Sequence, residues 1–101
     1  MAQRPYKVRS PDALARLIRH LHPQIKRKLR AAVEQIAADP HSGKALKDEL
    51  TGLWSFRVGR FRLVYRVTGA RALELVAFGG RKTIYEETYR LIARQTRRDA
   101  P

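Results

Sequence analysis

The sequence predicts an α+β domain with a short N-terminal strand, an antiparallel helical hairpin, a three-stranded antiparallel meander and a C-terminal helix. This prediction rests on a change in the spacing of apolar residues along the chain. Apolar residues recur with the period of a helix as far as Ile36, and with the period of a strand between residues 53 and 78. No linker, repeat or low-complexity stretch divides the 101 residues, so we expect residues 1–101 to form one domain.

The first half of the chain carries signals for one strand and two helices. Residues 6–9 alternate as a short strand, and Ser10 and Pro11 then supply an N-cap and a first-turn proline. The dipeptide His22-Pro23 ends the first helix and starts the second, and Asp39-Pro40 closes the second. The two apolar stripes at helical spacing are Leu14, Leu17, Ile18 and Leu21, then Ile25, Leu29, Ala32, Val33 and Ile36.

The second half of the chain predicts the meander and the last helix. Gly59-Arg60 and residues 68–71 separate the strands, and Gly79-Gly80 is expected to break the third. The strand segments rich in aromatic and β-branched residues are 53–58, 61–67 and 72–78. A C-terminal helix is indicated by the spacing of three residues expected to face the core, Tyr85, Tyr89 and Ile92. Glu86 is placed to pair with Arg90 on that helix.

The charge balance narrows the class of partner. The chain has 22 Lys and Arg against 9 Asp and Glu, a formal net charge of +13, yet 44% of its residues are hydrophobic, too many for a disordered basic tail. Such charge favours nucleic acid first, an acidic protein second and an anionic membrane third, and no apolar run is long enough to cross a membrane.

Cysteine and histidine usage excludes further chemistry. The chain has no cysteine, which excludes disulfides, thiolate chemistry and most zinc sites and fits a cytoplasmic location. His20, His22 and His41 lack the spacing of metal ligands. We therefore expect no metal and no cofactor.

The turn at Gly59-Arg60 predicts a strand register. Glycine at the first central position of a two-residue loop is the type II′ requirement. This register makes one face of the hairpin wholly apolar, so that it can pack on the helices. Its three pairs are Val58 with Phe61, Phe56 with Leu63, and Trp54 with Tyr65.

The other face of the hairpin brings two arginines together. Its pairs are Arg57 with Arg62, Ser55 with Val64, and Leu53 with Arg66. Like charges directly opposite each other destabilise a sheet, and neither strand contains a carboxylate. We therefore expect an external anion to bind Arg57 and Arg62, with Arg81 as a third basic group at the same end. The alternative is two solvated arginines whose side chains splay apart.

Three segments follow one another in an ordered pattern: Gly43-Lys44-Ala45-Leu46, the run from Gly52 to Arg66 that contains RVGRFRLVYR, and Gly80-Arg81-Lys82-Thr83-Ile84-Tyr85. These segments resemble the RelE/ParE superfamily of toxin–antitoxin toxins, and the predicted element order is that superfamily's fold. The resemblance covers nearly the whole chain and implies two possible activities. RelE-like members cut messenger RNA in the ribosomal A site, whereas ParE-like members poison DNA gyrase on the same scaffold.

The resemblance also implies a set of catalytic residues. In RelE-like enzymes a basic cluster on the sheet activates the ribose 2′-hydroxyl, neutralises the phosphorane-like charge and protonates the 5′-oxygen, and a tyrosine assists. Arg57, Arg62, Arg81 and Tyr85 match that cluster. The helical spacing of Tyr85 favours a role in the core as the alternative.

Two positions depart from the family pattern. Ser55 stands where the well-studied type has lysine, and Gly80 stands where many relatives have histidine. Arginine is a very poor general base, so the base is unassigned. Lys44, Lys47 or Lys82 is a candidate if it folds toward the arginines, and ribosomal RNA is another.

The leading prediction is a ribosome-dependent endoribonuclease that cleaves messenger RNA, the toxin of a type II system. Its partners would be the ribosome, messenger RNA and a cognate antitoxin, part of which folds on binding. A ParE-like inhibitor of DNA gyrase and a non-catalytic nucleic-acid-binding module are the alternatives. The expected phosphate contacts are Lys44, Lys47, Arg60, Arg66 and Lys82, while the run Lys26-Arg27-Lys28-Arg30 is interpreted as a solvated face.

Overall fold

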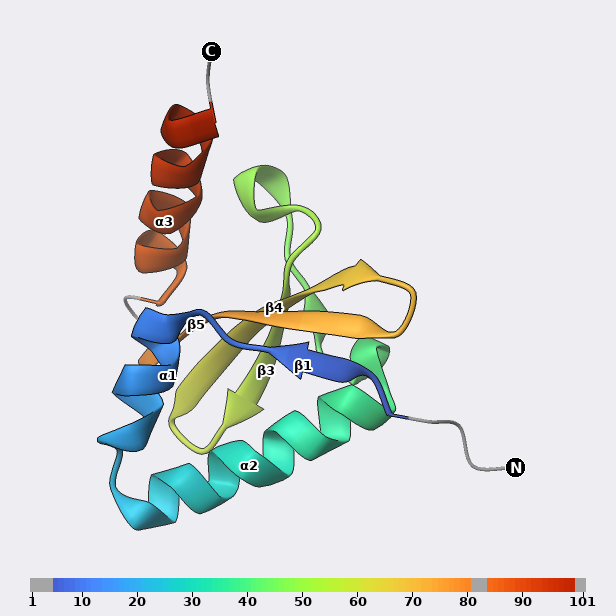
Figure 1. The fold of residues 1–101 in the computed structure, drawn as a ribbon, viewed down its shortest axis with the longest axis vertical. Helices are drawn as coiled ribbons and strands as arrows, with labels where there is room; N and C mark the ends of the chain where they lie inside the picture. Colours follow the sequence, from blue (N-terminus) through green and yellow to red (C-terminus); the bar gives the residue numbers. More distant parts are fainter. Residues whose placement is uncertain (1–4, 81–83, 100–101) are drawn as a thin grey trace.

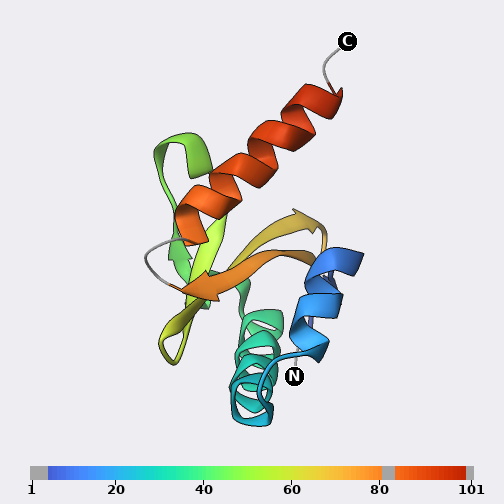
Figure 2. The ribbon, with the colours of Figure 1, turned by 90° about the vertical axis from the view of Figure 1, so that its left-hand side faces the viewer.

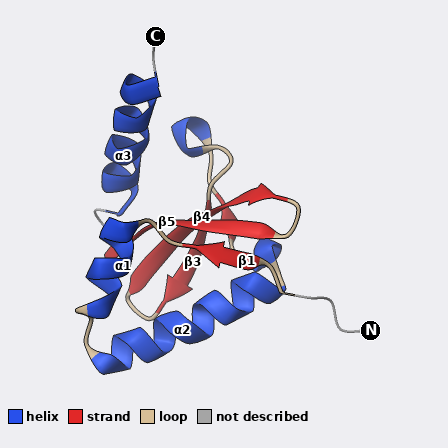
Figure 3. Ribbon diagram, in the orientation of Figure 1, coloured by secondary structure: helices blue, strands red, loops and turns tan. Residues whose placement is uncertain are grey.

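The computed structural model describes residues 5–80 and 84–99 as a five-stranded sheet flanked by three helices (Figures 1 and 3). This architecture confirms the predicted α+β class. The elements are β1 (Lys7–Arg9), α1 (Asp12–Arg19), α2 (Pro23–Ala38), a 3-10 turn η1 (Pro40–Ser42), β2 (Lys44–Ala45), a second 3-10 turn η2 (Asp48–Leu50), β3 (Trp54–Val58), β4 (Phe61–Gly69), β5 (Ala72–Gly80) and α3 (Ile84–Asp99).

The predicted meander is the centre of a larger sheet with the order β1-β5-β4-β3-β2. Strand β1 pairs in parallel with the start of β5, and β2 pairs antiparallel with β3. The segment between α2 and β3, for which the sequence predicts no strand, thus supplies an edge strand. Gly43 makes this possible, because a Cβ there would lie 2.8 Å from the Ser55 carbonyl oxygen and 2.5 Å from the Tyr65 hydroxyl.

Two helices cover one face of the sheet. Their apolar side chains, led by Leu14 from α1 and by Leu29 and Ile36 from α2, pack with Leu63 and Tyr65 of β4. The hydroxyl of Tyr65 donates a hydrogen bond of 2.6 Å to the Pro40 carbonyl oxygen. The apolar face predicted for the hairpin is therefore confirmed as the floor of the main core.

The junction of α1 and α2 differs from the antiparallel hairpin that the sequence predicts. The two helices meet at a steep angle (Figures 1 and 2), because each packs its own stripe on the sheet. Pro11, not Ser10, occupies the N-cap of α1, and no side chain caps that end. The His22 Nδ1 accepts a hydrogen bond of 3.1 Å from the Gln24 amide, which caps α2 as Pro23 begins it.

Helix α3 covers part of the opposite face, the one on which the arginine pair is predicted (Figure 2). A second apolar cluster joins Leu53, Val64 and Ala77 to Ile84 at the start of α3. Strand β5 alternates between the two cores, with a bulge at Val76. The glycines expected to end β5 extend it instead, because Phe61 and Arg62 provide the main-chain partners for Gly80 and Gly79.

The buried side of α3 follows the predicted stripe at Tyr85 and Ile92, which pack against the second core, but not at Tyr89. Ile84 and Thr88 are fully buried, whereas Tyr89 is 52% exposed and Tyr85 is half-buried. Glu86 and Arg90 form no ion pair in the described part of the chain, contrary to prediction. Among the described residues, no helix is both long and apolar enough to cross a membrane.

Candidate functional site

The hairpin of β3 and β4 has the predicted register. Gly59 has φ +62°, as a type II′ turn requires, and Arg57 lies directly opposite Arg62. The expected pair of Leu53 with Arg66 does not form, because β3 begins at Trp54 and Leu53 belongs to the second core. The other predicted pairs, Trp54 with Tyr65, Ser55 with Val64, Phe56 with Leu63 and Val58 with Phe61, are all present.

The two arginines lie near the turn, beyond the part of the face that α3 covers. Arg57 is exposed, and its Nε donates a hydrogen bond of 3.1 Å to the Gly59 carbonyl oxygen, while Arg62 is half-buried. No carboxylate forms an ion pair with either arginine within residues 5–80 and 84–99. Both guanidinium groups therefore retain donors for an anion such as a phosphate.

The carboxylate of Glu87, on α3, lies beside this arginine pair. The sequence does not predict this neighbour. Gly79 is directly opposite Arg62, and Glu87 Oε2 lies 3.8 Å from the position that a Cβ on Gly79 would take. Because opposed residues on a sheet point the same way, Arg62 and Glu87 occupy one face. Glu87 comes close to Arg62 because α3 folds back over Gly79, a contact between segments that the sequence does not predict.

Strand β2 brings a lysine to the other side of the pair. Lys44 lies directly opposite Ser55, so its side chain shares the face of Arg57, two residues further along β3. Diagonal neighbours of this kind are about 7–8 Å apart, within reach of long side chains. Lys44 thus lies on the strand next to Ser55, the position at which the family pattern has lysine.

Ser55 and Tyr85 are tied to each other at the edge of the site. Ser55 is only 1% exposed, and the Tyr85 hydroxyl donates a hydrogen bond of 3.2 Å to its Oγ. The Tyr85 ring packs against the second core. This bond fixes the position of the ring close to Lys44 but leaves Ser55 inaccessible to a substrate.

The other predicted phosphate contacts fall in different places. Arg60 is exposed in the turn, and Lys47 lines a shallow groove between η2 and α3 with Tyr89. Arg66 pairs with Glu74 of β5, with a bond of 3.0 Å from Nε to Oε1, so its charge is already neutralised. Arg81 and Lys82 lie outside the described residues. Within the described part, no group of three or more potential ligands could hold a metal ion.

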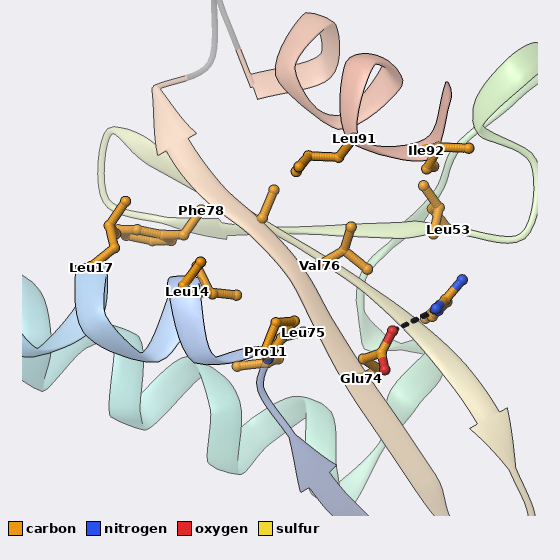
Figure 4. A pocket seen from close by; sticks show the side chains of 13 residues that line it. Pro11, Leu14, Leu17, Leu53, Glu74, Leu75, Val76, Phe78, Leu91 and Ile92 are labelled. Carbon is orange, nitrogen blue, oxygen red and sulfur yellow. Dashed lines mark hydrogen bonds and ion pairs between the residues drawn. The ribbon is translucent and has the colours of Figure 1, made fainter. Parts of the chain in front are cut away.

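An apolar cavity of about 260 Å³ lies on β5 between α1 and α3 (Figure 4). Leu17 and Leu91 flank it from the two helices, with exposures of 46% and 39%. Strand β1 pairs only with Ala72–Glu74 of β5, so of the β5 residues that line the cavity only Glu74 has β1 beside it. The ion pair between Arg66 and Glu74 lies at one end of the cavity.

The fold and the site together describe a small α+β domain with a pair of opposed arginines on one face of its sheet. The family model described as the ParE toxin of the type II toxin–antitoxin system, parDE, matches residues 8–85. The chain belongs to this family, and it is a toxin of a type II toxin–antitoxin system within the RelE/ParE superfamily.

Solved structures agree with this assignment. The RelBE2 toxin–antitoxin complex of Mycobacterium tuberculosis contains a chain with 29% identity and a TM-score of 0.67, covering 76% of this chain and 92% of that one. A mutant Escherichia coli RelE toxin in the free state has 16% identity and a TM-score of 0.70, and the match covers 90% of this chain and 97% of that one. A chain of the RelE–RelB complex of Pyrococcus horikoshii has 19% identity and a TM-score of 0.62, and the match covers 76% of this chain and 96% of that one. No curated protein matches the chain.

Proposed function

We propose that this toxin is a ribosome-dependent endoribonuclease that cleaves messenger RNA and so inhibits translation. The observation that carries the proposal is the pairing of Arg57 with Arg62 on an accessible part of the sheet, with no ion-paired carboxylate among the described residues. Like charges held opposite each other are unfavourable until an anion joins them. A phosphodiester supplies that anion, and two guanidinium groups can bind its oxygens as charge builds up during cleavage.

The chemistry we propose is attack of a ribose 2′-oxygen on the adjacent phosphorus. The bond from phosphorus to the 5′-oxygen breaks, and a 2′,3′-cyclic phosphate and a 5′-hydroxyl form. The 2′-hydroxyl must lose a proton and the leaving 5′-oxygen must gain one, so the reaction needs two proton-transfer groups on opposite sides of the phosphate. Arg57 and Arg62 would stabilise the charge, and by resemblance Arg81 would assist.

Glu87 and Lys44 suit the two proton transfers. Glu87 lies on the β5 side of the arginine pair and Lys44 on the β2 side, so they flank a phosphate held between them. A carboxylate accepts a proton directly at neutral pH, whereas an ammonium group has one to donate. We therefore assign proton acceptance from the 2′-hydroxyl to Glu87 and protonation of the 5′-oxygen to Lys44.

One induction experiment tests the proposed activity. The toxin is expressed from a tight promoter, and protein synthesis, messenger RNA integrity and chromosome breaks are followed in the same cells. We expect translation to stop first and messenger RNA to be cut at positions in step with the reading frame. Gyrase-dependent DNA breaks with intact messenger RNA would contradict the proposal.

Inhibition of DNA gyrase is the second candidate, and two observations favour it. The matching family model carries the ParE name, and the position of the family lysine is held by the buried Ser55. In this alternative the arginine pair would contact an acidic surface of gyrase. The gyrase-dependent breaks measured in the same experiment would support it.

We also propose that a cognate antitoxin binds the cavity of Figure 4. The complexes among the similar structures pair a RelE toxin with a RelB antitoxin. Exposed Leu17 and Leu91 present apolar surface on both sides of the cavity, and the net charge of +13 favours an acidic partner. An acidic segment with apolar side chains at regular spacing, folding on this surface, fits both features.

A further inference from the structure

A second basic pocket lies on the other side of the same hairpin turn, between α2 and the loop that joins β3 to β4. It has a volume of about 310 Å³. Its floor is apolar, made by Ile25, Val58 and Phe61, whose side chains pack against the main core. Lys28 and Arg60 are exposed at its rim. Arg57 and Arg62 lie on the opposite face of the sheet, so the turn separates two basic sites.

The side chain of Lys28 is directed at the turn. Its Nζ lies 3.7 Å, and its Cδ 3.8 Å, from the position that a Cβ on Gly59 would take. Glycine at this position allows the φ of +62°, while the lysine lies at van der Waals distance from the turn. The exposed ammonium group thus lies beside Gly59, the residue that precedes Arg60.

The two positive charges at the rim are not neutralised within the described part of the chain. Neither Lys28 nor Arg60 forms an ion pair there. No acidic residue lines the pocket, and the first turn of α2 contains none. A cationic rim over an apolar floor is suited to a ligand with a phosphate at one end and a flat apolar group at the other.

We propose that this pocket binds one nucleotide of single-stranded RNA, with the phosphate at Lys28 and Arg60 and the base against the floor. Phe61, whose ring centroid lies 5.4 Å from that of Phe78, provides an aromatic surface for the base. An acidic peptide would use the cations but has no planar group for this floor. The inference rests on the proposed function only in that the same RNA would continue round the turn to Arg57 and Arg62.

The test measures binding of a 2′-O-methyl RNA oligonucleotide, which lacks the attacking hydroxyl and so reports binding without cleavage. Fluorescence anisotropy gives the affinity of the full-length toxin and of its Lys28→Gln and Arg60→Gln variants at several salt concentrations. Arg27→Gln is the matched control, because Arg27 is exposed on the same helix and does not line the pocket.

We expect each pocket variant to bind the RNA at least fivefold more weakly than wild type. Each should also reduce the slope of log affinity against log salt by about 0.7, the value for one phosphate contact on a single strand. Phe61→Leu should weaken binding about threefold or more with little change in this slope, because it removes stacking and not charge. Thermal unfolding of each variant checks that the fold is retained.

Two results would overturn the inference. One is equal RNA affinity in the Lys28→Gln, Arg60→Gln and Arg27→Gln proteins. The other is a polyglutamate peptide that binds as tightly as the RNA and with the same dependence on Lys28 and Arg60, which would make the pocket a site for acidic protein. Failure of the proposed function is recognised separately, by normal RNA binding without cleavage on ribosomes.

Discussion

The arginine pair shows how much a single turn residue decides. Gly59 closes the hairpin in one register, and that register buries Val58 while it sets Arg57 against Arg62. A slip by one residue would place Arg57 opposite Leu63 and Val58 opposite Arg62, so that one of the two arginines would face the main core at the cost of burying its charge. The opposition of the two arginines is thus a consequence of burying the apolar face.

Arg62→Ala should abolish toxicity without unfolding the protein. The substitution removes one of two opposed charges, so the free energy of unfolding should change by no more than about 1 kcal/mol. Growth after induction and thermal unfolding of the purified variant measure the two effects, with Arg30→Ala on α2 as the control. Arg81→Ala is expected to behave alike, on the basis of the family resemblance. A variant of Arg62 that fails to fold would show a structural role instead.

Glu87→Gln should slow messenger RNA cleavage on ribosomes by about 100-fold or more while RNA affinity is kept, because the amide cannot accept the proton. Glu86→Gln makes the same change of charge at the preceding residue of α3, and this variant should cleave messenger RNA as fast as wild type does. Cleavage rates of the two purified variants decide the question. Equal rates would remove Glu87 from the mechanism.

Tyr65 should make the fold sensitive to alkaline pH. Burial raises the pKa of its hydroxyl above the usual 10.0, and the negative charge of Asp39 adds to this effect. The unfolded chain therefore releases this proton at a lower pH than the folded protein does, so the stabilisation is complete below pH 10 and falls as the pH rises further.

Urea unfolding of Tyr65→Phe and wild type at pH 8 and at pH 11 tests this expectation. At pH 8 the variant should be less stable by about 1 kcal/mol, because it lacks the hydrogen bond to Pro40. At pH 11 the difference should shrink, since phenylalanine cannot ionise. A difference that stays constant or grows would contradict the assignment.

At the scale of elements, the position of β2 depends on the close approach of Gly43 to β3 and to the Tyr65 side chain. Gly43→Ala would push a methyl group against the Ser55 carbonyl oxygen and the buried Tyr65 hydroxyl. We expect a loss of about 1–3 kcal/mol in the free energy of unfolding, measured in urea. Gly69→Ala is the control, because nothing lies within 4 Å of a Cβ there. Since β2 carries Lys44, the Gly43 variant should also cleave messenger RNA more slowly.

Helix α3 shows the limit of periodicity. The spacing of apolar and aromatic residues correctly predicts a helix, but it selects Tyr89 for the core in place of Thr88. Thr88 is buried because its hydroxyl donates a hydrogen bond of 2.7 Å to the Ile84 carbonyl oxygen of its own helix. A side chain that satisfies its polar atom locally can be buried like an apolar one.

At the scale of the whole molecule, the cavity between α1 and α3 predicts how the antitoxin binds. Leu17→Ser and Leu91→Ser should each weaken the complex about tenfold or more, because each loses the burial of an exposed leucine. Val67→Ser is the control, since Val67 is similarly exposed but lies outside the cavity. Titration calorimetry with the antitoxin measures the affinities. Equal effects of all three variants would argue against this surface.

The features that the sequence correctly predicts depend on neighbours along the chain. The hairpin register needs only Gly59 and the alternation on either side of it, and the start of α2 needs only His22 and Pro23. Antiparallel pairing across a two-residue turn involves only residues close in the sequence, so the turn type and the alternation of the strands predict the same register. The opposition of Arg57 and Arg62 could therefore be predicted without a structure.

The surroundings of that pair depend on contacts between distant segments. Lys44 reaches the site because a glycine lets β2 approach β3, and Glu87 reaches it because α3 folds back over Gly79. The steep angle of α1 and α2 likewise follows from packing on a twisted sheet. Pattern and charge along the chain establish the fold class and the opposition of Arg57 and Arg62. Which other charged side chains surround that pair is a property of the folded molecule, because the segments that carry them have no local reason to meet.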